Sequence, residues 1–157
     1  MNASTRTARR LAEFLPYQLS LASNAVSTRI ADQYRRRFAL RMTDWRVMAV
    51  LGDGGPLTQR QLCQLTLMDK VPVNRACKAL EERGLAERKP NENDGRSHLL
   101  ELTAEGRAVH ARIMPLAEKI EEELFSSLSS EERATLRAVL ARLREAAGEF
   151  DPESLAD

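Results

Sequence analysis

The sequence contains few of the residues on which enzymatic and metal-dependent functions rely. Its 157 residues include only two cysteines and two histidines. Their positions do not follow the spacing of a metal site: Cys63, Cys77, His98 and His110. No nucleophile-elbow motif accompanies the scattered acidic residues. We therefore expect a protein that is not an enzyme and that holds no metal or other cofactor.

The sequence also has no long apolar run. Its longest runs of apolar residues fall far short of the roughly 20 residues that a membrane-spanning helix needs. The first residues, Met1 to Arg6, lead into charged sequence and not into the apolar core of a signal peptide. With 43% hydrophobic, 4% aromatic and 30% charged residues, the composition is typical of a soluble, helix-rich domain. These features predict a cytoplasmic protein without a membrane partner.

The segment between Leu57 and Thr103 has the pattern of a winged helix-turn-helix. A T-x-x-Q capping box at Thr58 and Gln61 predicts the start of a first short helix. A second helix is expected to begin after Asp69 as N-cap and to end at Gly84 in the left-handed conformation.

The two faces of this second helix differ in polarity. One face is apolar at helical spacing, through Val73, Ala76, Cys77 and Leu80. The opposite face carries Asn74, Arg75 and Lys78, whose side chains can donate to base edges or phosphates. A solvated helix face is the alternative interpretation of these three residues.

A basic β-hairpin is predicted to follow the second helix. Strands are expected over residues 85–90 and 96–102, on either side of the turn-forming run from Asn91 to Gly95. Arg88, Lys89 and Arg96 make the hairpin basic. An arginine at the tip suits a narrow minor groove. Asp94 is expected to hold Arg96 through a charge-assisted hydrogen bond.

Helices are predicted outside this unit. Apolar residues recur at steps of three or four from Leu15 to Phe38, and Thr43 is expected to cap a short helix that ends at Gly52–Pro56. Thr103 and a capping box at Ser129 begin two C-terminal helices, the last with an apolar stripe reaching Phe150. We expect a mainly α fold with a small β-hairpin wing. Its parts are an N-terminal helix (1–40), a winged helix-turn-helix (41–102) and C-terminal helices (103–157).

The net charge of +1 conceals an uneven distribution. Residues 1–46 hold nine Lys or Arg against three acidic residues, whereas residues 101–157 hold seven against thirteen. A nucleic-acid partner is therefore compatible with the small net charge, provided that the acidic end faces away from it.

Three motifs between Thr58 and Arg107 resemble the MarR (multiple antibiotic resistance regulator) family of bacterial transcription factors. They are T-Q-R-Q-L at 58–62, D-K-V-P-V-N-R at 69–75, and D-G-R at 94–96 followed by L-T-A-E-G-R at 102–107. The resemblance implies a ligand-responsive homodimeric repressor that binds a pseudo-palindromic operator. In such a dimer the N-terminal segment and the C-terminal helices of two chains interleave. This arrangement would also bury the apolar stripes of these outer helices, which are too long for the winged unit to cover alone.

We assign the DNA contacts as hypotheses. Asn74 and Arg75 are expected to contact bases. Pro72, where relatives often have a hydroxyl residue, is expected to contact a thymine methyl group. Phosphate contacts are expected from Lys78, Gln59 and Arg60, and a minor-groove contact from Arg96. The full candidate surface for double-stranded DNA consists of Gln59, Arg60, Pro72, Asn74, Arg75, Lys78, Arg88, Lys89, Asp94 and Arg96.

The resemblance further implies a cleft for a small aromatic or anionic effector, between the dimer helices and the winged unit. Candidate lining residues are Tyr17, Asn24, Ser27, Trp45, Met48, His110 and Met114, each of which has a core or interface role as its alternative. The run Arg35–Arg37 is a candidate for the phosphates of an acyl-coenzyme A thioester, or for a solvated or DNA-facing surface.

Two other functions stay open from the sequence. In a thiol-redox regulator of this family a reactive cysteine lies in the first long helix, where this chain has Ser20. Cys63 and Cys77 are expected to be inert structural thiols, because reactivity requires exposure and a lowered pKa. The other alternative is a winged-helix protein-interaction module without specific DNA binding, in which the hairpin adds to the sheet of a partner.

Overall fold

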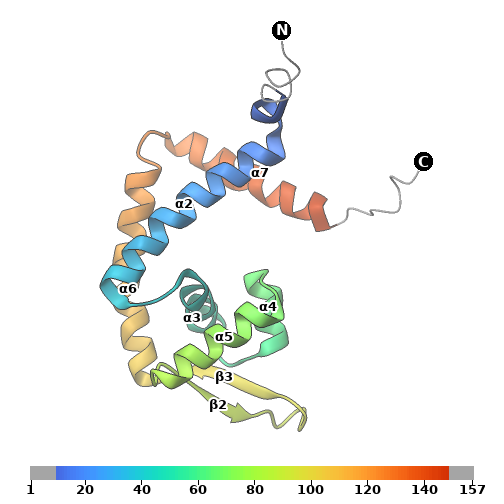
Figure 1. Cartoon of the computed structure of the whole chain (residues 1–157), viewed down its shortest axis with the longest axis vertical. Helices are drawn as coiled ribbons and strands as arrows, with labels where there is room; N and C mark the ends of the chain where they lie inside the picture. Colours follow the sequence, from blue (N-terminus) through green and yellow to red (C-terminus); the bar gives the residue numbers. More distant parts are fainter. Residues whose placement is uncertain (1–9, 149–157) are drawn as a thin grey trace, which may run out of the picture. The chain divides into compact units, whose positions relative to one another are not determined.

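The computed structural model describes residues 10–148, so the predicted position of Phe150 lies outside the described residues (Figure 1). The chain forms two compact units, Met1–Glu118 and Lys119–Asp157. Helices dominate and a small antiparallel sheet accompanies them, which confirms the expected fold class. None of the described helices is long and apolar enough to span a membrane.

The first unit contains the winged helix-turn-helix and the long helix that precedes it. Its elements are α2 (Leu15–Phe38), α3 (Met42–Gly54), β1 (Leu57–Thr58), α4 (Gln59–Thr66), α5 (Lys70–Glu82), β2 (Ala86–Pro90), β3 (His98–Leu102) and the greater part of α6 (Ala104–Leu124). The second unit contains the end of α6 and helix α7 (Ser130–Gly148).

The predicted capping box opens α4. The Thr58 hydroxyl accepts a hydrogen bond from the Gln61 backbone N–H at 3.2 Å. In return, Gln61 Oε1 accepts from the Thr58 backbone N–H at 2.9 Å. Because both donors belong to the first turn, where no helical partner exists, the box fixes where α4 begins.

Helix α5 begins and ends where the sequence predicts. Asp69 is the N-cap residue, but its carboxylate makes no capping hydrogen bond, and its backbone carbonyl accepts from Val73 N–H instead. Gly84 has a φ of 68°, the left-handed conformation that glycine adopts without a Cβ clash. The predicted apolar face is buried along its whole length, at Val73, Ala76, Cys77 and Leu80.

The sheet has one strand more than the sequence predicts. The hairpin strands β2 and β3 pair from Ala86 with Leu102 to Pro90 with His98, as expected. Strand β1 then pairs with the other edge of β3, so that Leu57 lies opposite Leu100 and the strand order is β1-β3-β2. Only two residues long, β1 coincides with the capping box and leaves no periodic signal of its own.

The start of α3 differs from the prediction. Arg41, not Thr43, is the N-cap residue. The carboxylate of Asp44 accepts from the Arg41 backbone N–H at 3.1 Å and from its guanidinium at 3.0 and 2.8 Å. Asp44 is only 4% exposed, and this pairing supplies the hydrogen bonds that a buried carboxylate requires.

Helix α3 also continues through part of the glycine-rich run that was expected to end it, as far as Gly54. A Cβ at Gly52 would lie 2.6 Å from Nε2 of His110 on α6, so any larger residue there would require the imidazole to move. The glycine-rich run therefore first allows α3 and α6 to approach each other closely and then forms a turn.

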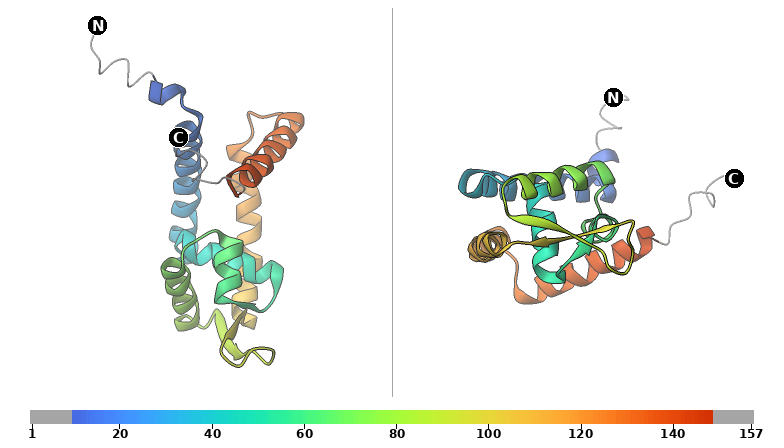
Figure 2. Two further views of the ribbon diagram at one scale, coloured as in Figure 1. Left: turned by 90° about the vertical axis from the view of Figure 1, so that its right-hand side faces the viewer. Right: turned by 90° about the horizontal axis from the view of Figure 1, so that it is seen from below.

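The core of the first unit lies between α3, α4, α5 and the sheet. Its fully buried large side chains are Leu40, Val47, Met48, Leu62, Val73, Leu80 and Ile113. Thr103 caps α6 as predicted, since its hydroxyl accepts from Gly106 N–H at 3.0 Å. Figure 2, seen from below, shows that α5 and the hairpin lie on the same side of this unit. The core therefore presents both predicted DNA-reading elements together.

Candidate DNA-binding surface

Helix α5 presents a polar face to solvent. Asn74, Arg75 and Lys78 are all exposed, on the side opposite the buried residues of this helix. The Lys78 ammonium lies 3.9 Å from the Glu82 carboxylate, and both side chains are more than half exposed. Such a pair contributes about 0.3–0.5 kcal/mol, so phosphate can replace Glu82 at little cost.

The wing tip holds Arg96 through its backbone. Asp94 Oδ1 accepts a hydrogen bond from the Arg96 backbone N–H at 3.1 Å. The expected contact between these residues thus exists, but it does not involve the guanidinium. Among residues 10–148 no ion pair joins the Arg96 side chain to a carboxylate, and the residue is exposed. The charge of Arg96 is therefore available to a ligand outside the chain.

The other two basic residues of the hairpin are paired within the protein. Arg88 Nε donates to Glu81 Oε1 on α5 at 2.8 Å. The Lys89 ammonium contacts Glu101 and lies 3.6 Å from Glu87. Its hydrogen bond with Glu101 raises the pKa of Lys89 and lowers the pKa of Glu101. Arg88 and Lys89 thus already contact carboxylates of the chain, which sets them apart from Arg96.

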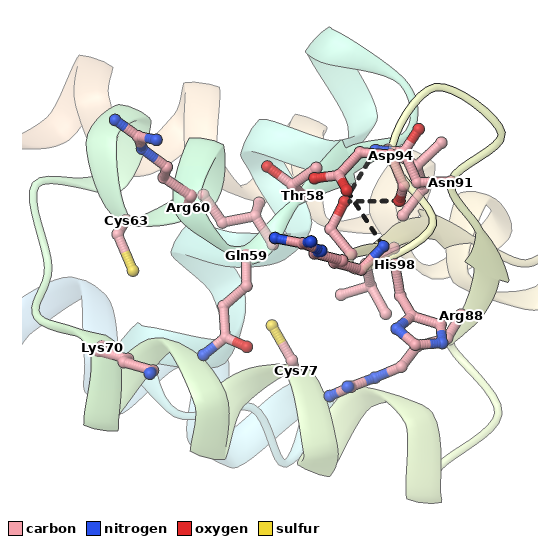
Figure 3. A pocket seen from close by; sticks show the side chains of 15 residues that line it. Thr58, Gln59, Arg60, Cys63, Lys70, Cys77, Arg88, Asn91, Asp94 and His98 are labelled. Atoms are coloured by element: carbon pink, nitrogen blue, oxygen red, sulfur yellow. Dashed lines mark hydrogen bonds between the residues drawn. The ribbon is translucent and has the colours of Figure 1, made fainter.

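A cavity of about 600 Å³ lies between α4, α5 and the wing (Figure 3). Basic side chains at its wall are Arg60, Lys70, Arg88 and Arg96. Gln59 extends toward α5 between Lys70 and Cys77, and its buried Nε2 atom has no hydrogen-bond partner. Gln59 is thus half-buried at the wall of this cavity, whereas Arg60 is exposed and suits the predicted phosphate contact better.

The two cysteines line this same cavity without forming a disulfide. Cys63 is half-buried and Cys77 is buried. Burial raises the pKa of the Cys77 thiol to about 11, because the surroundings disfavour the thiolate. A thiol of this kind is a poor nucleophile at neutral pH. Among the described residues, no group of three His, Cys, Asp or Glu side chains is arranged to hold a metal ion.

The candidate effector residues are only partly brought together. Trp45 and His110 stack with ring centroids 5.7 Å apart, and Tyr34 packs edge-on against Trp45 at 5.1 Å. Met48 is fully buried in the core. The remaining candidates lie nearer the surface. Exposed are Tyr17, Asn24 and Met114, and Ser27 is half-buried.

Two residues that the sequence interpretation did not single out also belong to this region. Val71, in the first turn of α5, is 61% exposed, whereas its neighbour Pro72 is half-buried. Arg83, the C-cap of α5, donates to the backbone carbonyls of Phe38 and Ala39. Helical spacing places Val71 in line with Arg75 and could have identified it. No local signal identifies Arg83, because its partners lie 44 and 45 residues away.

Comparison with known proteins agrees with this geometry. A model of the MarR family matches residues 40–97, which include α3, α4, α5, strand β2 and the turn of the wing. The chain is also 32% identical to a probable transcriptional regulator from Pseudomonas aeruginosa of known structure, with a TM-score of 0.70, covering 83% of this chain and 99% of that one. The chain belongs to the MarR family. As a MarR-family member it is a DNA-binding transcription regulator and not an enzyme.

Two more distant MarR-like structures share the fold. A mutant of Escherichia coli MarR complexed with operator DNA is 23% identical, with a TM-score of 0.74, covering 82% of this chain and 92% of that one. BpsR of Bordetella bronchiseptica, whose DNA binding is regulated by 6-hydroxynicotinic acid, is also 23% identical. Its TM-score is 0.70, with 81% of this chain and 98% of that one covered.

Proposed function

We propose that this MarR-family chain is a homodimeric repressor that binds a pseudo-palindromic operator and releases it when a small aromatic or anionic effector binds. The observation that carries the proposal is the shared exposure of Asn74, Arg75 and Lys78 on α5 and of Arg96 at the wing tip. A helix and a basic hairpin on one side of a unit suit a major groove and the adjacent minor groove. This function belongs in the cytoplasm, with the chromosome.

Each DNA contact follows from the chemistry of its side chain. Asn74 and Arg75 can form bidentate hydrogen bonds with adenine and guanine edges, and these contacts would specify sequence. Lys78 and Arg60 carry exposed charges for phosphates, which would position the helix without reading bases. The likeness to a MarR protein bound to operator DNA supports the same placement.

Exposed apolar side chains support the homodimer. On α2, Leu15 is 74% and Leu19 is 46% exposed; on α7, Leu140 is 39% and Leu143 is 46% exposed. A second copy of the chain would remove these surfaces from water, which is the main favourable term in association. Two-fold symmetry would then place the two α5 helices about 34–36 Å apart, one turn of DNA.

The test combines genomic footprinting with a binding measurement on the recovered duplex. We expect a pseudo-palindromic footprint, one dimer per duplex in analytical ultracentrifugation, and an affinity that falls steeply as salt increases. Salt-insensitive binding to another protein, with no binding to any duplex, would instead identify an interaction module. A monomer at micromolar concentration would contradict the proposed dimer.

Trp45 supports the effector proposal and also provides its assay. It is the single tryptophan of the chain, and it stacks on His110, so its fluorescence reports this site directly. Benzoate and benzoyl-coenzyme A are suitable probes because they combine an aromatic ring with negative charge. We expect one of them to change Trp45 fluorescence and weaken operator binding over the same concentration range, as thermodynamic linkage requires. A fluorescence change without loss of DNA binding would contradict effector-controlled release.

A further inference from the structure

Exposed apolar side chains gather at one place in the winged unit. Leu65 is 58%, Leu67 is 79% and Val71 is 61% exposed, around the turn between α4 and α5. The other large hydrophobic residues of comparable exposure, among those described, precede α3 or lie on α6 and α7. Those helices carry the proposed dimer interface. The three residues at the turn lie outside these helices, and Val71 is the one of them on α5.

Val71 lies in the row of α5 residues that faces away from the core. Arg75 and Lys78 follow it by four and seven residues, a spacing that places all three on one line of the helix surface. The buried residues of α5 occupy the opposite side. Val71 is thus an uncovered apolar group at the N-terminal end of a row that is otherwise charged.

The fold gives no reason for valine at this position. Its side chain is mostly exposed and so contributes little burial to stability. In a helix, valine is also less favourable than alanine, because its branched Cβ loses rotamer freedom against the preceding turn. A benefit for valine is therefore expected from a contact outside the chain.

Duplex DNA offers one apolar group to a helix in its major groove, the C5 methyl of thymine. We propose that Val71 packs against a thymine methyl group in each half-site and is thereby a specificity-determining residue. The inference rests on the proposed function, in which α5 enters the major groove. We take Val71 in preference to Pro72 for this contact, because Pro72 is half-buried whereas Val71 faces outward with Arg75.

The proposal can be tested by removing the two partners of the contact separately. In the operator duplex recovered by footprinting, each thymine is replaced in turn by deoxyuridine, which lacks only the methyl group. Binding constants are then measured for the wild-type protein and for Val71→Ala. Leu65→Ala is the matched control, because it removes an equally exposed apolar side chain from α4 and leaves the α5 row intact.

We expect one thymine per half-site whose replacement weakens wild-type binding roughly fourfold, the value of one buried methyl group. Val71→Ala should weaken binding to the normal duplex to a similar extent and become insensitive to deoxyuridine at that position. Leu65→Ala should keep the full sensitivity. Thermal melting should show that Val71→Ala is as stable as the wild type, since alanine is the better helix former.

Two results would overturn the inference while DNA binding persists. One is wild-type affinity of Val71→Ala for the normal duplex. The other is a deoxyuridine penalty that is the same for wild type and Val71→Ala at every position. If the wild-type protein binds no duplex at all, the proposed function itself fails, and this outcome is distinct from the other two.

Discussion

Arg83 joins the end of α5 to the end of α2. Its Nη1 atom donates to the backbone carbonyl of Ala39, and its Nη2 atom donates to that of Phe38, both at 3.0 Å. Phe38 is the last residue of α2, and Ala39 follows it in the left-handed conformation with a φ of 51°. The guanidinium therefore satisfies carbonyls at a helix end that have no helical donor.

Replacing Arg83 should show whether this junction contributes to stability. We expect Arg83→Ala to lower the free energy of unfolding by about 1–2 kcal/mol, as for loss of charge-assisted hydrogen bonds on an exposed side chain. Arg83→Lys should recover only part of it, because an ammonium cannot reproduce the planar fork. Urea unfolding measures both values. Equal stability of Arg83→Lys and wild type would show that charge alone matters.

Removing the free guanidinium at the wing tip should weaken operator binding. For Arg96→Ala we expect at least a tenfold loss, about 1.4 kcal/mol, because the minor-groove contact disappears while the wing turn keeps its backbone hydrogen bond. A gel shift at fixed salt measures the loss. Glu92→Ala is the control at the same tip and should bind at least as tightly as wild type. Unchanged binding by Arg96→Ala would exclude the minor-groove assignment.

Lys78 should act through phosphate and not through base edges. We expect Lys78→Ala to weaken binding to specific and unrelated duplexes alike, and to reduce the slope of log affinity against log salt by about one unit. Arg142→Ala on α7 removes the same charge from an exposed position and should leave the slope unchanged. A slope that does not change in Lys78→Ala would remove this residue from the phosphate contacts.

The two cysteines should differ in reactivity. With a pKa of about 11, Cys77 holds only about one thiolate in a thousand at pH 8. We expect iodoacetamide to label the half-buried Cys63 first in the folded protein, and the rate at Cys77 to rise with pH up to pH 11. Mass spectrometry with Cys63→Ser and Cys77→Ser variants separates the sites. Fast labelling of Cys77 at pH 7 would instead support the alternative of a thiol-redox-responsive regulator.

Local signals in the sequence predicted most of the winged unit. The capping box at Thr58, the two faces of α5 and Gly84 each depend on residues within a few positions, so their spacing is enough. Features that depend on partners far away in the sequence become visible only in the structure. Strand β1 exists because Leu57 pairs with Leu100, and the role of Arg83 depends on Ala39.

The candidate site was predicted less completely than the fold. Residue type identifies Arg96 as a basic group, but it does not reveal that Arg88 is already bound to Glu81. The N-cap of α3 was misplaced for a related reason. Capping statistics favour the hydroxyl of Thr43, whereas here the carboxylate of Asp44 reaches back to Arg41.

Gly106 has a consequence for how the wing can move. A Cβ at this position would lie 1.9 Å from the carbonyl oxygen of Leu85, just before strand β2, so α6 and the hairpin touch through bare backbone. The hydroxyl of Thr103 also donates to the Gly84 carbonyl at 2.6 Å. With no side chain between them to yield, the first turn of α6 and the base of the hairpin are expected to move together. A tilt of that turn by a few degrees would swing Arg96 through the larger arc of the wing tip.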